Sequence, residues 1–335
     1  MRTHKKIAVL AIITIAFALG AAVMPAMADS GVSEGTFTMT NTAPVVGTIN
    51  LCLENGDDAG STMTPQVVYN VSMEITDLNQ LDDLVTIDVV IQDTAYAWGS
   101  DTNVSRKVAY QWTPEGWAES SRPSETPGGN TWGVLDTAKC TVPSDLSATS
   151  DTWWLCFTPG KVAKEATWNI TVTATDVALD HRNVLGSLSM QWYGEIEPKA
   201  VADQSFGFGD LGLGTNNDSV TNAPVDFNTT TNGNYKLTSG TENWAFGEYT
   251  VTLDTDGGAL AAGTFALRNL GADTVASADY VPTSAGTITE LSDETSNYLE
   301  VGNTVPVYLW LSTASAGIMP GEYAGTYTLT IANNG

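Results

Sequence analysis

Apolar and polar side chains alternate at every second residue along most of the chain. In TWNITVTATD, residues 167–176, one face carries Trp168, Ile170, Val172 and Ala174, and the other carries threonine and asparagine. A period of two is that of a half-buried β-strand and not of a helix. Similar runs, of which VVYNVSMEI and VTIDVVI are the clearest, recur between clusters of Gly, Pro, Asn, Asp and Ser. The pattern predicts an all-β fold.

A break in this alternation predicts two domains. About eight strand-like runs, from GTFTMT to LSMQWY, precede the charged, proline-containing stretch EIEPKAVADQS. More runs follow it and end in GTYTLTI. Short alternating strands separated by turns favour antiparallel β-sandwiches of immunoglobulin-like type. We expect one such domain at residues 29–196, a linker at 197–204 and a second β-sandwich at 205–335.

The first residues have the organisation of a secretory signal. Basic Arg2, Lys5 and Lys6 precede an apolar run, which ends at a proline and the triplet Ala-Met-Ala. We expect a signal peptide at residues 1–28, with cleavage before Asp29; the alternative is an uncleaved N-terminal anchor. The processed protein is then expected to be secreted and to work outside the cell or on its surface.

The chain is strongly acidic, with 38 Asp and Glu against 13 Lys and Arg and a net charge of -25. Nucleic acids and anionic membrane surfaces would be repelled, so neither is expected as a partner. Such a charge fits a protein that binds cations or works in salty surroundings. The alternative is that the acidity only maintains solubility.

Three cysteines and one histidine limit the chemistry. In an oxidising compartment we expect a disulfide between Cys140 and Cys156, which flank a turn-rich segment; pairing of Cys52 with either of them is the alternative. His181 is the only histidine after the signal and is expected in a solvated loop. A zinc site of several histidines is therefore excluded, and only a pair of carboxylates would be left for catalysis. We expect the protein not to be an enzyme.

An acidic turn is the candidate metal site. TDLNQLDD places four oxygen-bearing side chains between two strong strands, at Asp77, Asn79, Asp82 and Asp83. Ca²⁺ takes six to eight oxygen ligands, and such a turn offers several. Asp and Asn also favour turns through local hydrogen bonds, so turn chemistry is the competing explanation here and in the shorter acidic loops at 54–58 and 254–258.

Five sequons mark possible glycosylation. Two of their asparagines are at outward positions of predicted strands and three in apparent loops or strand ends, namely Asn70, Asn169, Asn103, Asn217 and Asn228. The alternative is unmodified surface asparagine.

Tryptophans are the last candidates. Trp112, Trp168 and Trp192 are in phase with apolar neighbours and are expected in the core. Glycan-stacking positions are expected among the rings of loop segments and of the adjacent pair at 153–154, namely Trp98, Trp117, Trp132 and Trp154. Packing under long loops explains these rings equally well.

Both halves resemble modules of prokaryotic surface proteins. The C-terminal half, with FGDLGLGTNNDSVTNAPVDF, GNYKLTSGTENW and VPVYLWLSTASAGIMPGEYAGTYTLTI, is similar to β-sandwich modules of secreted surface proteins in which a G-x-Y-x-G-x-Y strand closes the sheet. The N-terminal half, with VSMEITDLNQLDDLVTIDVVI and FTPGKVAKEATWNITVTATD, resembles immunoglobulin-like modules of archaeal cell-surface and S-layer-associated proteins.

The resemblance and the composition together imply a structural or self-assembling surface protein, such as a surface-layer, filament or coat component. Its expected partners are copies of itself, other surface proteins or glycans, and Ca²⁺ is the expected stabilising ion. The alternative function is a carbohydrate-binding module or adhesin that recognises a glycan through the loop tryptophans.

Overall fold

The structure of the chain, a computed structural model, describes residues 35–95, 106–120, 133–283, 286–294 and 303–334. It divides into two compact units, Met1–Thr40 and Asn41–Gly335. Residues 35–40, the described part of the first unit, contain no helix or strand. The predicted signal peptide, residues 1–28, lies outside the described residues. No helix of the described part is long and apolar enough to cross a membrane.

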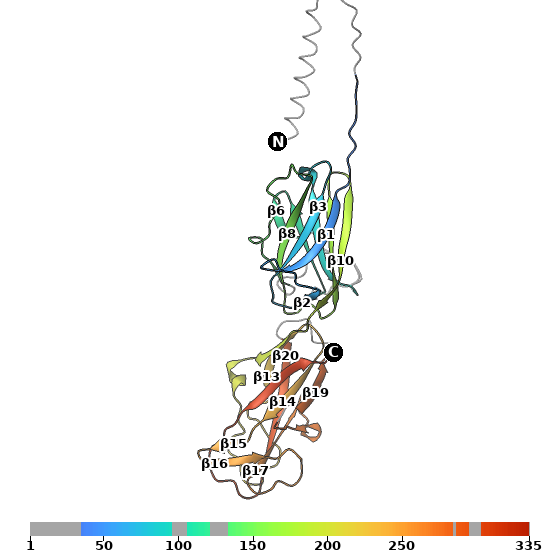
Figure 1. Cartoon of the computed structure of the whole chain (residues 1–335). Coiled ribbons are helices and arrows are strands. Elements are labelled where there is room, and N and C mark those ends of the chain that lie inside the picture. The colour runs from blue at the N-terminus through green and yellow to red at the C-terminus, as the bar shows by residue number, and fades with distance from the viewer. Residues whose placement is uncertain (1–34, 96–105, 121–132, 284–285, 295–302, 335) are drawn as a thin grey trace, which may run out of the picture. The chain divides into compact units, whose positions relative to one another are not determined.

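The second unit consists of β-strands in four sheets, which confirms the predicted all-β fold (Figure 1). Among the described residues the named helices are short 3-10 turns: η1 (Leu81–Asp83), η4 (Val201–Gln204) and η5 (Val275–Ser277). The sheets form two sets, one before residue 191 and one after residue 193, and each set has its own hydrophobic cluster.

The first set contains a four-stranded and a six-stranded sheet. Sheet 1 has the strand order β1 (Val45–Leu53), β3 (Tyr69–Thr76), β8 (Ser150–Pro159), β7 (Gly133–Leu135). Sheet 2 has the order β2 (Thr62–Met63), β10 (Asp180–Met190), β9 (Thr167–Thr175), β4 (Thr86–Asp93), β5 (Lys107–Thr113), β6 (Gly116–Glu119). All neighbours are antiparallel except β2 and β10, which are parallel.

The alternation seen in the sequence fills the core of this set. In β9 the apolar residues Trp168, Ile170, Val172 and Ala174 are all fully buried. The four inward residues of β3, from Tyr69 to Ile75, meet them from the opposite sheet. Burying one such side chain stabilises the fold by about 1.5–3 kcal/mol. The inward faces of these two strands therefore supply a large part of the driving force for folding.

The second set contains an eight-stranded and a three-stranded sheet. Sheet 3 has the order β11 (Gly194–Pro198), β13 (Val225–Thr231), β20 (Asn303–Thr313), β17 (Thr264–Leu270), β16 (Tyr249–Leu253), β15 (Trp244–Phe246), with β12 (Asp218–Ser219) on β20 and β18 (Asp279–Tyr280) on β17. Sheet 4 has the order β19 (Gly286–Glu294), β14 (Tyr235–Thr241), β21 (Tyr327–Asn333).

The change from the first set to the second occurs earlier than the predicted linker. β11 pairs with β13, so residues 194–198 belong to sheet 3, and η4 follows within the predicted linker 197–204. Only residues 191–193 connect β10 to β11. The strand was missed because its alternation is short and its polar positions are the charged Glu195 and Glu197, which read as a loop.

One buried asparagine joins the two sets. Asn232 is fully buried just after β13, and its Nδ2 donates to the carbonyls of Ala163 (2.7 Å) and Gln191 (2.8 Å). Its Oδ1 accepts from the amide of Tyr193 at 2.6 Å. The side chain thus has a partner for each of its polar atoms, as a buried amide requires.

Neighbouring groups complete this junction. The amide of Glu165 donates to the Asn232 carbonyl at 2.8 Å, and Lys161 Nζ lies 2.6 Å from Glu195 Oε1. Tyr193 Oη donates to the other Glu195 oxygen at 2.6 Å. Burial acts to raise the pKa of Glu195, but these two hydrogen bonds outweigh it and hold the pKa below its ordinary value. The junction is therefore both hydrogen-bonded and charge-compensated.

The expectation of a loop position for His181 is wrong. The residue lies in β10, and its Nδ1 accepts the amide of Val46 in β1 at 3.0 Å. Asn183 Nδ2 adds a bond to the carbonyl of Gly47 at 2.7 Å. Both side chains therefore cover part of the β1 edge. The surrounding sequence, rich in Asp, Arg and Asn, concealed the strand.

Candidate functional site

The candidate site is a hollow on the outer face of sheet 4, with a volume of about 390 Å³. Its lining is made of hydroxyl groups around a glycine and one carboxylate, with Gly240, Glu242, Thr283, Thr326, Thr328 and Thr330 as the main contributors. Gly240 pairs with Thr328 across β14 and β21. Because glycine has no side chain, the sheet is open at this point between the flanking threonines.

Hydrogen bonds fix the walls of this hollow. Thr326 donates its amide to Glu242 Oε1 at 3.1 Å, and Thr241 Oγ1 donates to the Thr326 carbonyl at 2.9 Å. Trp244 Nε1 in turn donates to Thr241 Oγ1 at 3.1 Å. Among the described residues of the lining, Glu242 is the only charged one. The site therefore offers hydroxyl donors and acceptors with one fixed anion, which suits an uncharged polyhydroxyl ligand better than an anion.

The glycines of the G-x-Y-x-G-x-Y motif support aromatic rings next to the hollow. A Cβ atom on Gly321 would overlap the ring of Phe246, and one on Gly325 would overlap the ring of Trp244. Between them, Ala324 exchanges two backbone hydrogen bonds with Ala245 of β15, at 2.9 and 3.0 Å. The motif thus lets β15 lie flat on the chain just before β21.

The predicted metal residues lie in one turn but do not converge. Asp77 is fully buried, and its Oδ1 accepts the amide of Asn79 at 2.8 Å, a local turn hydrogen bond. Asn79 Oδ1 accepts the amide of Thr42 at 2.7 Å. Asp82 and Asp83 lie in η1, where Asp82 is exposed. In the part of the chain that is described, no three His, Cys, Asp or Glu side chains are placed to hold a metal. A calcium site here stays a prediction.

Asp77 is nevertheless electrostatically unusual. Burial raises its pKa, the Asn79 amide opposes this, and the charges of Asp176 and Asp83 raise it further. Its Oδ2 is buried and has no hydrogen-bond partner. Asp176 differs, because three donors, the amides of Ala178 and Leu179 and the Asn41 side chain, outweigh burial and lower its pKa.

The shorter acidic loops also show turn chemistry. At 54–58, Asn55 Oδ1 accepts the amide of Asp57 at 3.1 Å. At 254–258, Asp254 Oδ1 accepts the amide of Asp256 at 3.0 Å. Both are local hydrogen bonds of the kind through which Asn and Asp favour turns.

The sequons differ in accessibility. Asn70 is outward-facing, as predicted, but the turn after β1 covers it: its Nδ2 lies 3.5 Å from the carbonyl of Leu53 and 3.4 Å from that of Glu54. The atom that would carry a glycan thus has two long contacts with the backbone, and glycosylation of Asn70 stays a prediction. Glycosylation of the half-buried residues Asn169, Asn217 and Asn228 stays a prediction, and Asn103 lies outside the described residues.

The tryptophans do not form an exposed platform in the described part. Trp117 lies in β6 opposite Trp112 and is only 8% exposed, so its expected loop position is wrong. Trp154 is half-buried on the outer face of β8, while Trp153 is in the core. Trp192, expected in the core, is half-buried at the junction and donates to the Asn234 carbonyl at 3.1 Å. Trp98 and Trp132 lie outside the described residues.

The three cysteines are free thiols, although a disulfide between Cys140 and Cys156 was expected. Cys140 and Cys156 are not bonded, although Cys140 Sγ accepts the amide of Cys156 at 3.1 Å. Burial raises the pKa of Cys156 to about 11, which keeps this thiol protonated at neutral pH. Cys52 and Cys156 pair with Asn70 from opposite sides, about 9.5 Å apart at ordinary strand spacing, too far for a disulfide. An oxidised Cys140–Cys156 pair stays a prediction.

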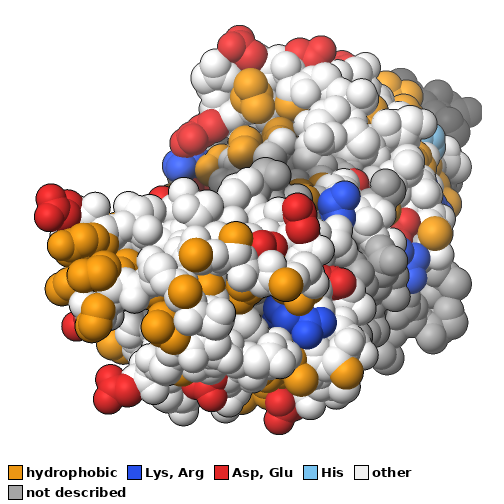
Figure 2. All heavy atoms as spheres, turned by 90° about the horizontal axis from the view of Figure 1, so that it is seen from below, with side chains coloured by type: hydrophobic (Ala, Val, Ile, Leu, Met, Phe, Trp, Pro, Cys, Tyr) orange, Lys and Arg blue, Asp and Glu red, His pale blue; other side chains and the backbone are white. Residues whose placement is uncertain are grey.

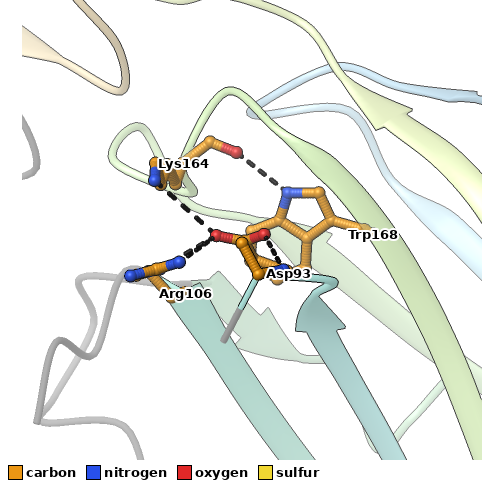
Figure 3. A network of polar contacts seen from close by, with 5 residues as sticks. Asp93, Arg106, Lys164 and Trp168 are labelled. Carbon is orange, nitrogen blue, oxygen red and sulfur yellow. Dashed lines mark hydrogen bonds and ion pairs between the residues drawn. The ribbon is translucent and has the colours of Figure 1, made fainter. Parts of the chain in front are cut away.

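A buried ion-pair network lies at the end of β4, beside the loop that carries Ala163 and Glu165 (Figure 3). Asp93, at the end of β4, has a side chain only 2% exposed. Its Oδ2 lies 2.8 Å from Arg106 Nη2 and 3.7 Å from Lys164 Nζ, and its Oδ1 accepts the amide of Ala95. Trp168 Nε1 donates to the carbonyl of Lys164 at 2.9 Å. The charge is thus compensated and the loop holding Lys164 is fixed to the core.

No protein-family model and no curated protein matches the chain. Among solved structures it is similar to the C-terminal domain of the antigen I/II-family protein AspA of Streptococcus pyogenes, with 10% identity and a TM-score of 0.26 over 88% of this chain and 97% of that one. A second is the C-terminal domain of the AgI/II polypeptide BspA of Streptococcus agalactiae, with 10% identity and a TM-score of 0.25 over 87% and 96%. TM-scores of this size establish neither a shared fold nor a shared function.

The hollow on sheet 4 was missed in the sequence. Its signal is Gly240, a glycine inside the strand-like run KLTSGT, because such a glycine marks a bulge or a place where another group approaches the backbone.

Proposed function

We propose that the protein is an extracellular structural component of a cell surface, built from two β-sandwiches and assembling through contacts between copies. The strand order of the first set supports an immunoglobulin-type sandwich. Immunoglobulin strands are lettered in chain order. With β1 as A and β3 as B, the order β1-β3-β8-β7 of sheet 1 becomes A-B-E-D, and the order β10-β9-β4-β5-β6 of sheet 2 becomes G-F-C-C′-C″. That is the arrangement of variable-type domains.

The observation that carries the structural role is the junction at Asn232. Two domains in one chain ordinarily move relative to each other unless their interface is extensive. Here the fully buried Asn232 side chain donates to Ala163 of the first set and makes two more hydrogen bonds with the connecting residues 191 and 193. Asn333 Nδ2 adds a bond to Glu165 Oε1 at 3.1 Å. A hydrogen-bonded junction suits a building element, whose shape has to be kept from copy to copy.

The surface charge bears on how copies meet. Acidic side chains are spread over the face shown in Figure 2, with few Lys or Arg between them. Like-charged faces repel each other, so contacts between copies need charge-free segments or counter-ions. We therefore include divalent cations in the proposal, with the Asp77–Asp83 turn as the candidate site.

Light scattering on residues 29–335 tests this function. Particle size is expected to grow with protein concentration and to fall when Ca²⁺ is replaced by a chelator. The variant D82N/D83N removes two carboxylates of the turn and leaves the buried Asp77 in place. If Ca²⁺ acts at this turn, the variant loses the response to Ca²⁺; if Ca²⁺ only screens surface charge, the response is kept. A monomer at every concentration, with and without Ca²⁺, would overturn self-assembly.

A second candidate function is glycan recognition, and the hydroxyl-lined hollow favours it. Its residues differ from the predicted tryptophans. Titration of the protein with neutral mono- and disaccharides tests it: binding is expected to be lost in G240V, which fills the hollow, and kept in T250V, on a different strand of the same set. Equal binding by both variants would remove the hollow from consideration.

A further inference from the structure

Three loops of the first set lie at one end of its sandwich. They join β3 to β4, β5 to β6 and β9 to β10, at residues 77–85, 114–115 and 176–179. Thr86, at the start of β4, pairs with Thr175 at the end of β9, and Ile87 pairs with Trp112 near the end of β5. In the lettering of variable-type domains these are the B–C, C′–C″ and F–G loops, the three that such domains use for recognition.

The two longer loops lie side by side. The amide of Val85 donates to the last carbonyl of β9 at 2.8 Å. The chain just before β1 bridges the loops, because Asn41 Nδ2 donates to Asp176 Oδ2 and the amide of Thr42 donates to Asn79 Oδ1, both at 2.7 Å. The loops at 77–85 and 176–179 therefore form one surface.

This surface carries exposed aliphatic side chains where turns ordinarily carry polar ones. Each loop begins with a buried aspartate, Asp77 or Asp176, whose Oδ1 accepts the amide two residues further on. The residue after each aspartate is exposed, Leu78 by 72% and Val177 by 75%. With two more exposed residues they form what we call the loop-end patch: Leu78, Val85, Val177 and Leu179. Apolar side chains gathered on adjoining loops are typical of a contact with another molecule.

The loop-end patch has an acidic border. The three loops and the first residue of β10 contain no Lys or Arg but six acidic residues, namely Asp77, Asp82, Asp83, Glu115, Asp176 and Asp180. Asp82, Glu115 and Asp180 are exposed. Charges around an interface select its partner, because like charges repel and opposite charges attract. A second copy of a chain with a net charge of -25 is therefore disfavoured, and a basic partner is favoured.

We propose that the loop-end patch binds a segment of another protein in which apolar side chains alternate with Lys or Arg. Leu78 and Val177 cover the apolar side chains of the segment, and Asp82 and Asp180 attract its cations. The patch lies in the first set, apart from the hydroxyl-lined hollow of sheet 4. The inference is also independent of self-assembly, because a basic partner is a different molecule from an acidic copy.

Fluorescence anisotropy with labelled peptides tests this proposal on residues 29–335. A chelator is present, so that no divalent cation neutralises the acidic border. The probe KLKVKLK has both features of the partner, KSKSKSK keeps only the charge, and ELEVELE reverses the charge. The variant L78N/V177N removes the two most exposed side chains of the patch. Its matched control, V201N/L213N, removes a valine and a leucine that are 81% and 57% exposed in the second set.

We expect KLKVKLK to bind at least tenfold more tightly than KSKSKSK, and ELEVELE not to bind. L78N/V177N should weaken binding of KLKVKLK at least tenfold, because two apolar contacts are lost, and V201N/L213N should leave it unchanged. D82N/D180N should weaken it about threefold and reduce its dependence on salt, whereas D210N/D256N, with the same net charge, should have less effect. Circular dichroism first shows that every variant is folded.

Four results would overturn the proposal. The first is absence of binding by KLKVKLK, and the second is equal binding of it by L78N/V177N and V201N/L213N, which places the contact elsewhere. The third is binding by 41–335 but not by 29–335, which means that the chain's own N-terminal residues occupy the patch. The fourth is a particle size in light scattering that falls in L78N/V177N alone, which identifies a second copy as the occupant.

Discussion

The junction residue Asn232 permits a quantitative prediction. In N232A, the carbonyls of Ala163 and Gln191 and the amide of Tyr193 lose their partners. A buried polar group left without a hydrogen bond costs about 1–3 kcal/mol. Ala163 is fully buried, whereas Gln191 is exposed and Tyr193 half-buried, so water reaches two of the three groups. We expect the free energy of unfolding to fall by about 3 kcal/mol, near the lower limit of the sum.

Urea unfolding followed by tryptophan fluorescence measures this change. N228A is the matched control, since it removes the same side chain from β13 outside the junction. N232D keeps the shape but turns an acceptor toward two carbonyls, so it should be at least as destabilising as N232A. A loss in N232A within about 0.5 kcal/mol of N228A would refute the view that this side chain holds the two sets together.

Three further predictions concern other parts of the fold. D93A leaves Arg106 and Lys164 without their buried counter-charge. It should lower the free energy of unfolding by about 3 kcal/mol in a urea titration. G325V should displace the Trp244 ring and lower the free energy of unfolding by about 2 kcal/mol. Calorimetry should show this as a melting temperature lower by several degrees. Since the pKa of Glu195 is lowered in the folded chain, its stabilisation is present at neutral pH and is lost as the pH falls through that pKa; E195Q should flatten this acid limb of the stability curve.

Each has a control that separates its cause. R106M leaves Asp93 with Lys164 and should cost less than D93A. G247A tests a glycine whose Cβ would meet nothing, although its φ of 57° adds some strain, so it should cost less than G325V. E197Q carries the same charge change on the same strand as E195Q. Equal losses within any pair would contradict the corresponding explanation.

Much of the fold could be predicted because its signal is local. The alternation in β3 and β9 gives strand type, inward face and core residues directly, and the structure confirms each of them. β11 failed this test because Glu195 and Glu197 occupy its alternate positions, and only pairing with β13 identifies it as a strand. Where pairing with another strand decides whether a segment becomes a strand, the sequence of that segment alone is insufficient to predict it.

The candidate sites depended on contacts that residue composition does not show. Asn70 faces outward, as its phase predicts, and its Nδ2 also contacts the carbonyls of residues 53 and 54. Trp117 became a core residue because the two-residue turn before it starts β6. The acidic turn at Asp77 satisfies its own backbone, so its composition reported turn geometry first. Gly240 alone gave a usable sign of the hollow, through its place inside a strand.

The chain order of the two sets determines when their junction can form. Every described strand of the first set precedes residue 191, whereas Asn232 lies 41 residues beyond Gln191. Because domains generally fold as units, and the N-terminal one first during synthesis, the first set can form while the Ala163 carbonyl is still open to water. The junction is then a late step of folding, completed when β13 has paired with β11.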